Sequence, residues 1–274
     1  MESVRAKCAW ACLAVLVWSA QSLGQQAGLT RQHHPWGQFQ PGAWNLVRVT
    51  TESYEGGQML KSVTETSTTL NAVDEAGVTL KVEVAVLVGG KRLDTDPQTL
   101  RQGFHGEVAG NEPVIRDLGR AELVVENRRV DCRVLELEFP RPGGRRLSKI
   151  WYSDAVDPYI IKRVTAVYGD DLKAPISKTS VEVVSLEASC GKSRNFRRAA
   201  RVKSVHEDAS GTTTTWASTS SVVPGGVICC SSQQVDKEGR LVLRSNMQLL
   251  DYGLQPSQGR SGLFWRWRST RGRR

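Results

Sequence analysis

Residues 149–165 read KIWYSDAVDPYIIKRVT, and this stretch decides the fold. An apolar run ends in Trp151 and Tyr152, a polar turn follows, and a β-branched run begins after Pro158. Asp and Pro favour tight turns, because the Asp side chain bonds nearby backbone amides and the Pro ring fixes φ. The stretch therefore predicts two antiparallel strands joined by a short turn, which is one unit of a β-meander.

A weaker copy of this pattern lies 65 residues further on, at Trp216. In both copies a Ser follows the Trp by two residues and a Pro follows it by seven or eight. The turn of the second copy reads VPGGV over residues 223–227. We expect both tryptophans, Trp151 and Trp216, to end a strand and to be largely buried. The two copies indicate a mainly β protein built from repeated meanders.

The strand end, the Pro-containing turn and the β-branched return strand resemble the lipoprotein-carrier (LolA/LppX-like) superfamily of exported proteins. They also resemble related bacterial exported proteins with a Trp-x-Ser…Val-Pro-Gly-Gly-Val signature. Residues 223–227 match the second part of this signature, whereas residues 156–160 depart from it because they lack both glycines. The resemblance covers residues 36–253. It implies a curved antiparallel sheet, a half-barrel with few short helices, whose apolar concave face can hold acyl chains. It identifies no ligand-contacting residue, because the motif is short and structural.

The clearest strand covers residues 78–88, where valine or leucine occupies every second position. Period two over eleven residues predicts a half-buried strand of an antiparallel sheet. Other strands are expected at residues 44–53, 60–70, 121–126, 130–139, 180–186 and 241–250. A shift of the apolar face near Leu135 predicts a bulge. Residues 96–103 predict a short helical turn, with Pro at a permitted first position and Gly as a stop, and the rest of 89–117 is expected to be loop.

The N-terminal residues differ in composition from the rest of the chain. Arg5 and Lys7 precede an uncharged apolar run over residues 8–18, and small residues follow up to Gly24. This pattern predicts a secretory signal peptide over residues 1–24, cut after Gly24, and therefore an exported (periplasmic or secreted) protein. An uncleaved N-terminal anchor is the alternative, although eleven apolar residues are too few to span a bilayer.

The rest of the chain divides by composition. Residues 25–35 are polar and are expected to be a flexible lead-in, and residues 36–44 combine aromatics and turn formers in what resembles a cap on one end of a sheet. Residues 36–190 form the first β half and residues 202–253 the second meander of the same domain. A basic segment, residues 191–201, is expected to link them.

Residues 254–274 form a basic, aromatic tail. Six of the nine net positive charges of the chain are arginines of this tail, so the body is only mildly basic. Alternating indoles and guanidinium groups are suited to the headgroup region of an anionic membrane, and the candidate contacts are Trp265, Arg266, Trp267 and Arg268. A solvated charged terminus, or a last strand followed by a charged end, is the alternative. Nucleic acid is not expected as a partner of an exported protein.

The sequence predicts no catalytic, cofactor or metal site. None of the four histidines has the spacing of a zinc motif, and no nucleophile elbow, phosphate loop or dinucleotide fingerprint occurs. Four tryptophans either line a groove or pack in the core: Trp36, Trp44, Trp151 and Trp216. For the cysteines beyond the signal peptide two alternatives stand. Either Cys132 forms a disulfide bridge with Cys190 or Cys229, or the cysteines are separate buried thiols.

These observations favour an exported, non-enzymatic β protein that binds a lipid or another hydrophobic or envelope-derived ligand. A structural or protein-interaction module of the cell envelope is the first alternative, and a hydrolase is the second. The concave face discriminates the first two. An apolar cavity open to solvent favours ligand binding, whereas a face filled by its own side chains favours a structural role.

Overall fold

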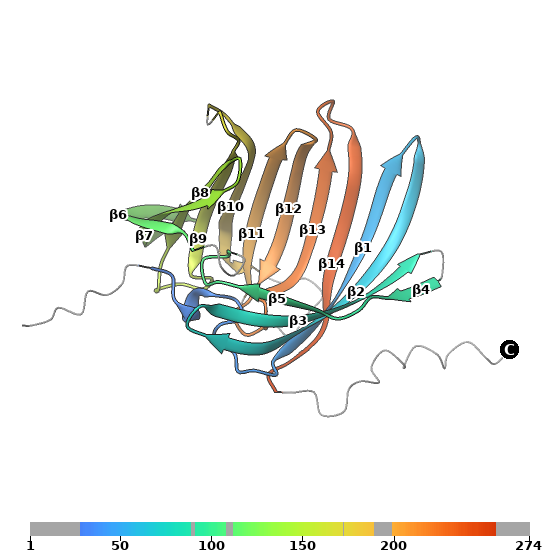
Figure 1. The fold of residues 1–274 in the computed structure, drawn as a ribbon, viewed down its shortest axis with the longest axis horizontal. Coiled ribbons are helices and arrows are strands. Elements are labelled where there is room, and N and C mark those ends of the chain that lie inside the picture. Colours follow the sequence, from blue (N-terminus) through green and yellow to red (C-terminus); the bar gives the residue numbers. More distant parts are fainter. Residues whose placement is uncertain (1–27, 89–90, 108–111, 172, 189–198, 256–274) are drawn as a thin grey trace, which may run out of the picture.

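The computed structural model describes residues 28–88, 91–107, 112–171, 173–188 and 199–255, which form one curved, unclosed antiparallel sheet (Figure 1). Its fourteen strands are β1 (Trp44–Glu55), β2 (Gln58–Asp74), β3 (Gly77–Val88), β4 (Lys91–Asp94), β5 (Gln98–Gln102), β6 (Val114–Val125), β7 (Arg128–Arg141), β8 (Gly144–Tyr152), β9 (Ile160–Tyr168), β10 (Pro175–Ala188), β11 (Ala199–Asp208), β12 (Gly211–Thr219), β13 (Val227–Val235) and β14 (Leu241–Gly253). The mainly β fold class is as predicted.

The sheet is a meander with one long-range junction. Strands β6 to β14 follow one another in order, and β14 pairs with β1, which continues the sheet into β2, β3 and β4. The chain passes from β5, which pairs with β3, to β6 at the opposite edge of the sheet. The connection between them begins at residues 103–107, which we call the crossing loop. Both predicted meanders, β8–β9 and β12–β13, belong to this single sheet.

The strand with the clearest alternation is confirmed. β3 spans Gly77–Val88, and Val78 and Leu80 are buried while Thr79 between them is partly exposed. Its register against β2 runs unbroken from Leu70↔Leu80 to Ser62↔Val88. The period-two pattern therefore predicted both the position of the strand and two residues near its start that are buried, Val78 and Leu80.

The short helical turn predicted for residues 96–103 is wrong. Residues Gln98–Gln102 form strand β5, and Leu100 pairs with Leu80 of β3. Two further strands lie in the region expected to be loop: β4 and the first residues of β6. The Pro and Gly signals describe only local preference. The edge of β3 carries backbone groups that need hydrogen-bond partners, and residues 98–102 supply them by pairing as a strand, which outweighs the local preference.

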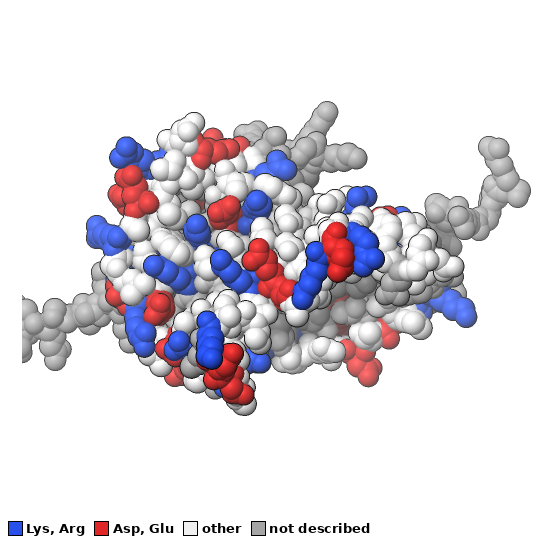
Figure 2. Space-filling model, turned by 90° about the horizontal axis from the view of Figure 1, so that it is seen from above, with Lys and Arg blue, Asp and Glu red and all other residues white. Residues whose placement is uncertain are grey.

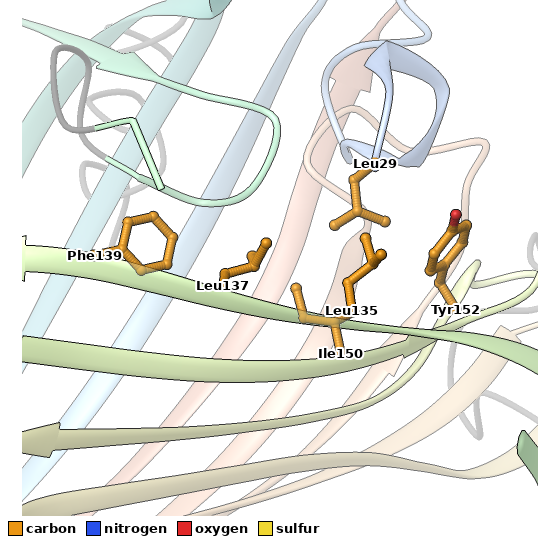
Figure 3. Packing of buried hydrophobic residues seen from close by; sticks show 6 residues of the cluster. All are labelled: Leu29, Leu135, Leu137, Phe139, Ile150 and Tyr152. Atoms are coloured by element: carbon orange, nitrogen blue, oxygen red, sulfur yellow. The ribbon is translucent and has the colours of Figure 1, made fainter. Parts of the chain in front are cut away.

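The N-terminal segment, residues 28–43, packs on the sheet, which differs from the flexible lead-in predicted for residues 25–35; residues 25–27 lie outside the described residues. Its only regular element is a 3₁₀ helix, η1 (Arg31–His33). Leu29 packs on a buried cluster of β7 and β8 (Figure 3). Trp36 packs on residues of β2 and β3. The segment thus bridges the two arms of the curved sheet, because apolar residues near both its ends have a cluster to enter. The cluster seen in Figure 3 consists of Leu29, Leu135, Leu137, Phe139, Ile150 and Tyr152.

The shift of face near Leu135 is present, but its cause differs from the prediction. In β7 the buried positions change parity between Val134 and Leu135, so the strand buries one face before this point and the other face after it. The β7–β8 register continues through both residues without a shift. The irregularity lies in the neighbouring edge strand, where β6 shifts register between Asp117 and Arg120. The bulge therefore belongs to β6, and β7 bends with it.

Strand register separates two faces of the sheet, because residues paired across neighbouring strands lie on the same face. Ile150 pairs with Arg163, and Arg163 pairs with Val181. We call this side the inner face, since the N-terminal segment covers it at Ile150. Trp151 pairs with Lys162 on the opposite side, the outer face.

Charge on the body of the protein is mixed. Seen from above, acidic and basic side chains are interspersed over the surface (Figure 2). Ion pairs along the strands account for part of this pattern, for example Arg48 with Glu65 at 2.6 Å and Arg116 with Glu136 at 3.1 Å. The described part of the chain contains no helix with the length and hydropathy that membrane crossing requires.

Candidate ligand-binding cavity

The second proline turn, residues 220–226 between β12 and β13, holds the middle of the N-terminal segment. The Gly225 amide donates to the Pro35 carbonyl at 3.2 Å. The side chain of Gln38 donates to the Ser221 carbonyl at 2.5 Å, and that of Asn45 donates to the Pro224 carbonyl at 2.7 Å. Two contacts of the segment and one from Asn45, at the start of β1, therefore fix this part of the chain against the turn.

Gly225 explains why the VPGGV sequence occurs in this turn. Its φ is +83°, a region that glycine adopts without steric cost. A Cβ at this position would lie 2.9 Å from Asn45 Nδ2 and 3.0 Å from a ring carbon of Trp36. The glycine is thus required both by the backbone conformation and by the close approach of the N-terminal segment.

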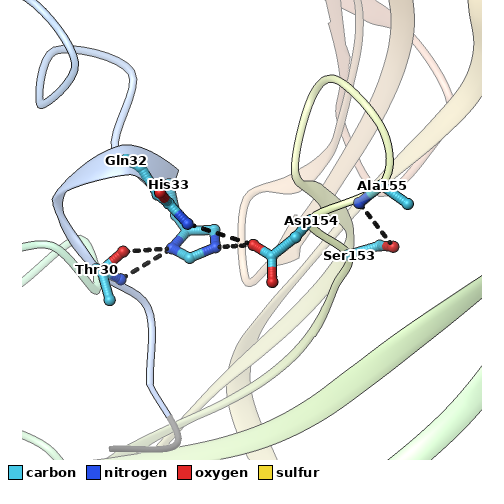
Figure 4. Close-up of polar contacts among 6 residues, drawn as sticks. All are labelled: Thr30, Gln32, His33, Ser153, Asp154 and Ala155. Atoms are coloured by element: carbon cyan, nitrogen blue, oxygen red, sulfur yellow. Dashed lines mark hydrogen bonds and ion pairs between the residues drawn. The ribbon is translucent and has the colours of Figure 1, made fainter. Parts of the chain in front are cut away.

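The first proline turn, residues 153–159 between β8 and β9, holds the start of the same segment (Figure 4). His33 Nε2 lies 2.7 Å from Asp154 Oδ1, and the buried His33 ring packs edge-on against Tyr152 and Tyr159 at centroid distances of 5.2 and 5.3 Å. The two turns also contact each other, because Ser221 Oγ donates to Asp157 Oδ2 at 2.5 Å. Both copies of the sequence repeat therefore meet beneath the N-terminal segment.

Thr30, His33 and Asp154 form a trio that sequence reasoning did not find. Thr30 Oγ1 lies 3.0 Å from His33 Nδ1, on the opposite side of the ring from Asp154. A hydroxyl, an imidazole and a carboxylate in series are the parts of a nucleophilic triad. However, the Thr30 backbone amide donates to the same Nδ1 at 2.9 Å. This bond uses the lone pair that a general base needs, so the trio clasps the segment rather than activating the hydroxyl.

A cavity of about 290 Å³ lies between the N-terminal segment, both proline turns and the inner face. Its walls are mostly apolar and include Pro35, Tyr159, Ile160, Val181, Val202 and Val227. Polar side chains also line it, among them Asp157, Arg163 and Thr219. The Oγ1 atom of Thr219 is buried and has no hydrogen-bond partner within the described residues. Apolar walls with few polar groups are typical of small-molecule sites.

Arg163 of β9 is the charged group that the inner face contributes to this cavity, and Asp157 of the first proline turn also lines it. Its Nε donates to Ser148 Oγ at 2.8 Å, and its Nη2 donates to the His105 carbonyl of the crossing loop at 3.0 Å. The loop can come this close because Gly106, with φ +81°, has no side chain: a Cβ there would lie 3.0 Å from Arg163 Nη1. Arg163 forms no ion pair with any carboxylate of the described residues. Its guanidinium is therefore held by neutral oxygens only.

Further ionisable groups surround Arg163. Burial, together with the positive charge of Arg146, lowers the pKa of the Arg163 guanidinium, while Glu107 raises it. Burial also lowers the pKa of Arg146, whose guanidinium stacks on the Phe139 ring at 3.9 Å. The Glu107 side chain is buried and its Oε2 has no partner in the described part of the chain. Two arginines thus face one glutamate, which leaves the neighbourhood with net positive charge.

Two histidines adjoin this group. Burial lowers the pKa of His34 below 6.5, against the opposing effects of Gln102 and Glu107. Burial also lowers the pKa of His105, which Glu107 raises and Arg163 lowers further. Both imidazoles therefore favour the neutral form in the folded protein, and neither balances the charge of Glu107 at neutral pH.

The two repeat tryptophans lie on the outer face, away from the cavity. Trp151 is next to the last residue of β8 and is half-buried, whereas Trp216 lies within β12 and is 39% exposed. The prediction that Trp216 ends its strand and is largely buried is wrong, because nothing in the described residues covers the outer face there except cations. Arg201 and Lys203 lie 5.2 and 5.5 Å from its ring.

The other tryptophans and the cysteines are placed as follows. Trp36 and Trp44 are buried, as the packing alternative predicts. Cys132 is a buried thiol whose pKa is raised by burial, and it forms no bridge to Cys229. Cys190 lies outside the described residues, so its pairing with Cys132 stays a prediction. Within the described ranges, no group of three or more His, Cys, Asp or Glu could hold a metal ion.

Several predicted segments lie wholly or partly outside the described residues. They are the signal peptide, residues 191–198 of the linker, and the tail residues Trp265, Arg266, Trp267 and Arg268. Residues 199–201, predicted as linker, begin strand β11.

Comparison with known proteins gives no sequence relative. No family model and no curated protein matches the chain. Among solved structures, a DUF1329 family protein from Desulfovibrio piger is 9% identical with a TM-score of 0.35, covering 82% of this chain and 90% of its own. A LolA superfamily protein from Nitrosomonas europaea is 11% identical with a TM-score of 0.34, covering 83% and 94%.

A third similar structure, named as a candidate exported protein with a YmcC-like fold, comes from Bacteroides fragilis. It is 10% identical with a TM-score of 0.30 and covers 78% of this chain and 97% of its own. The presence of a LolA superfamily protein among these structures fits the resemblance found in the sequence. At these TM-scores the similarity adds no site residue and no ligand.

Proposed function

We propose that this chain is an exported, non-catalytic protein that binds an apolar ligand in the cavity beneath its N-terminal segment. The observation that carries the proposal is the cavity itself, about 290 Å³ in volume, with walls from the N-terminal segment and both repeat turns. This volume is at the lower end of the range for small-molecule sites. A single apolar chain or a small ring system suits it better than a lipid with several chains.

Export is supported by the residues before the described part of the chain. The charged start, the apolar run of residues 8–18 and the small residues up to Gly24 have the composition of a secretory signal peptide. An exported carrier encounters envelope lipids and their fragments, so an apolar ligand of that origin is available to it.

A binding role, rather than catalysis, is supported by the chemistry of the polar groups. The His33 lone pair is used by the Thr30 amide, and Ser221, which lines the cavity, donates to Asp157 rather than to a histidine. Catalysis needs such a group within hydrogen-bond reach of the reacting atom.

The test is binding of the neutral fluorescent probe N-phenyl-1-naphthylamine to the purified protein and to two variants of β11. Val202 lines the cavity, so Val202→Phe should fill part of it and weaken probe binding at least several-fold. Val205 lies three residues along the same strand, on the outer face, where it pairs with Thr214. Val205→Phe should therefore bind the probe as the wild type does. Equal binding by both variants would place the probe elsewhere.

A structural module of the envelope is the second candidate, and the cluster around Leu29 favours it. There the inner face of β7 and β8 is filled by the protein's own N-terminal segment rather than left open. On this alternative the sheet presents surfaces to a protein partner. It predicts that the wild type binds no apolar probe and that organic extraction of the purified protein releases no small molecule.

A further inference from the structure

We propose that the ligand of the cavity is a single-chain amphiphile with an anionic head group, and that Arg163 binds this head group. The inference rests on the proposed function, since it names the chemical class of ligand for the same cavity. It assigns the head group to Arg163 and the apolar chain to the wall formed by Ile160, Val181 and Val202.

The first step is the unbalanced charge. The positive charge of Arg146 lowers the pKa of Arg163, and that of Arg141 lowers the pKa of Arg146, while Glu107 is the one acidic group that raises both pKa values. Glu107 makes no ion pair with either arginine; its Oε1 lies 3.7 Å from His105 Nδ1. A buried charge without an opposite charge is costly, because the protein interior solvates it poorly. An anionic ligand group beside Arg163 would remove this cost.

The second step is the way in which Arg163 is held. Ser148 Oγ and the His105 carbonyl accept from Nε and Nη2, which fixes the plane of the guanidinium. Neither acceptor neutralises its charge. A guanidinium in this state is oriented in advance for an anionic oxygen, which accepts stronger hydrogen bonds than a neutral oxygen does.

The third step is the contrast within the cavity. Beside Arg163 the lining is formed by aliphatic side chains of neighbouring strands, with Val181 directly paired to Arg163 and Val202 directly paired to Val183. Asp157 also lines the cavity, but it belongs to the first proline turn and accepts from Ser221 there. One cationic group beside an apolar wall matches an amphiphile with one anionic end. Carboxylate and phosphate share this chemistry.

The experiment compares probes of equal chain length that differ only in the head group. Purified full-length protein is titrated with decanoate, decyl phosphate, decanol and decyltrimethylammonium below their micelle concentrations, in competition with N-phenyl-1-naphthylamine. Inorganic phosphate alone is a further arm. The wild type should bind one or both anionic amphiphiles about 10- to 100-fold more tightly than decanol, the range of a charge-assisted hydrogen bond. It should bind the cationic amphiphile more weakly than decanol.

Two neighbouring residues of β9 provide the variant and its control. Arg163→Gln should abolish the preference for anions and retain decanol binding. Lys162 is adjacent in sequence but lies on the outer face, 5.7 Å from the Trp151 ring, so Lys162→Gln should keep the wild-type preference. If Arg163→Gln does not fold, the role of Arg163 is tested instead with the Arg163→Lys variant and with the preference of the wild type among the four amphiphiles.

The outcomes separate the two proposals. Decanol binding with no preference for an anion, or a preference that survives Arg163→Gln, overturns this inference and leaves the proposed function in place. Binding of inorganic phosphate as tight as that of decyl phosphate also overturns it, because the site would then recognise a free anion. If none of the four amphiphiles binds, the proposed function itself fails.

Discussion

His33 Nε2 lies 2.7 Å from Asp154 Oδ1, and this contact joins the N-terminal segment to the turn between β8 and β9. His33 Nδ1 accepts from the Thr30 amide, so Nε2 carries the proton that Asp154 accepts in the neutral ring. Asp154 is largely exposed, whereas the His33 side chain is buried. The contact therefore satisfies a buried donor with an acceptor from the surface.

Removing this acceptor should loosen the N-terminal segment. Asp154→Ala leaves the buried Nε2–H of His33 without its partner, and we expect a loss of about 1–2 kcal/mol in the free energy of unfolding. Urea denaturation measures it. Asp96→Ala, at an exposed position before β5, is the control and should change stability by less than about 0.5 kcal/mol. Equal effects of the two substitutions would show that the clasp contributes nothing.

Stability should fall as the pH drops below about 6.5. Burial lowers the pKa of both His34 and His105 in the folded protein, so the unfolded chain binds protons first and more of them. Their contribution is fully present above the ordinary histidine pKa and is lost as the pH falls toward the lowered values. Glu107, Gln102 and Arg163 are the groups acting on these two rings.

The measurement is the urea midpoint at pH 7.5 and at pH 5.5, where most carboxylates are still ionised. The double variant His34→Gln/His105→Gln should show a smaller difference between the two midpoints than the wild type does. An unchanged difference would mean that other groups cause the acid sensitivity.

The two repeat tryptophans should differ in their contribution to stability. Trp151 contacts a buried cluster of β6, β7, β9, β10 and β11, whereas Trp216 is 39% exposed beneath two cations. Trp151→Ala should therefore cost about 2–4 kcal/mol, somewhat below the range for a fully buried aromatic. Trp216→Ala should cost about 1 kcal/mol or less, near the value of exposed cation–π contacts. Thermal unfolding of the two variants side by side tests the order, and the reverse order contradicts it.

We also propose that the tail contacts anionic membranes through Trp265, Arg266, Trp267 and Arg268. Removing residues 260–274 should leave the unfolding transition unchanged and abolish binding to vesicles that contain anionic lipid. Each arginine near such a surface contributes about 1 kcal/mol, an attraction that salt screens over ~8–10 Å. Vesicle co-sedimentation at low and high salt measures this.

The control for the tail replaces Trp216 and Lys203 of the outer face by Ser, since these residues also combine an indole with a cation. That variant should still bind vesicles. Binding that survives truncation but not the outer-face substitutions would assign the contact to the sheet instead.

Strand positions followed from the sequence where the alternation was local and unbroken. Residues 78–88 predicted β3, and the Trp–Ser–Pro pattern predicted the turns of both meanders. Which face of a strand is covered did not follow, because an open, curved sheet buries a face only where a distant segment reaches it. Trp216 illustrates this: its sequence context matches that of Trp151, but no segment in the described residues packs over it.

The cavity was less accessible to prediction than the strands. Leu29 is one apolar residue within a polar run, so nothing local marks its segment as part of the core. His105 and Arg163 are 58 residues apart, and only the passage of the chain from β5 to the far edge of the sheet brings them together. The Pro-Gly-Gly turn was the one available signal, since its two glycines permit the close approach of another segment.

The pairing of β1 with β14 has a consequence for how the protein is made. Trp44 is opposite Gly253, so the central ladder of the sheet joins residues about two hundred positions apart. Until the last strand emerges, β1 and β13 each present an open edge to which another chain can add. Such a high contact order slows folding and prolongs exposure of these edges. Shortening the chain by its final strand, β14, would leave two separate half-sheets, β1–β5 and β6–β13.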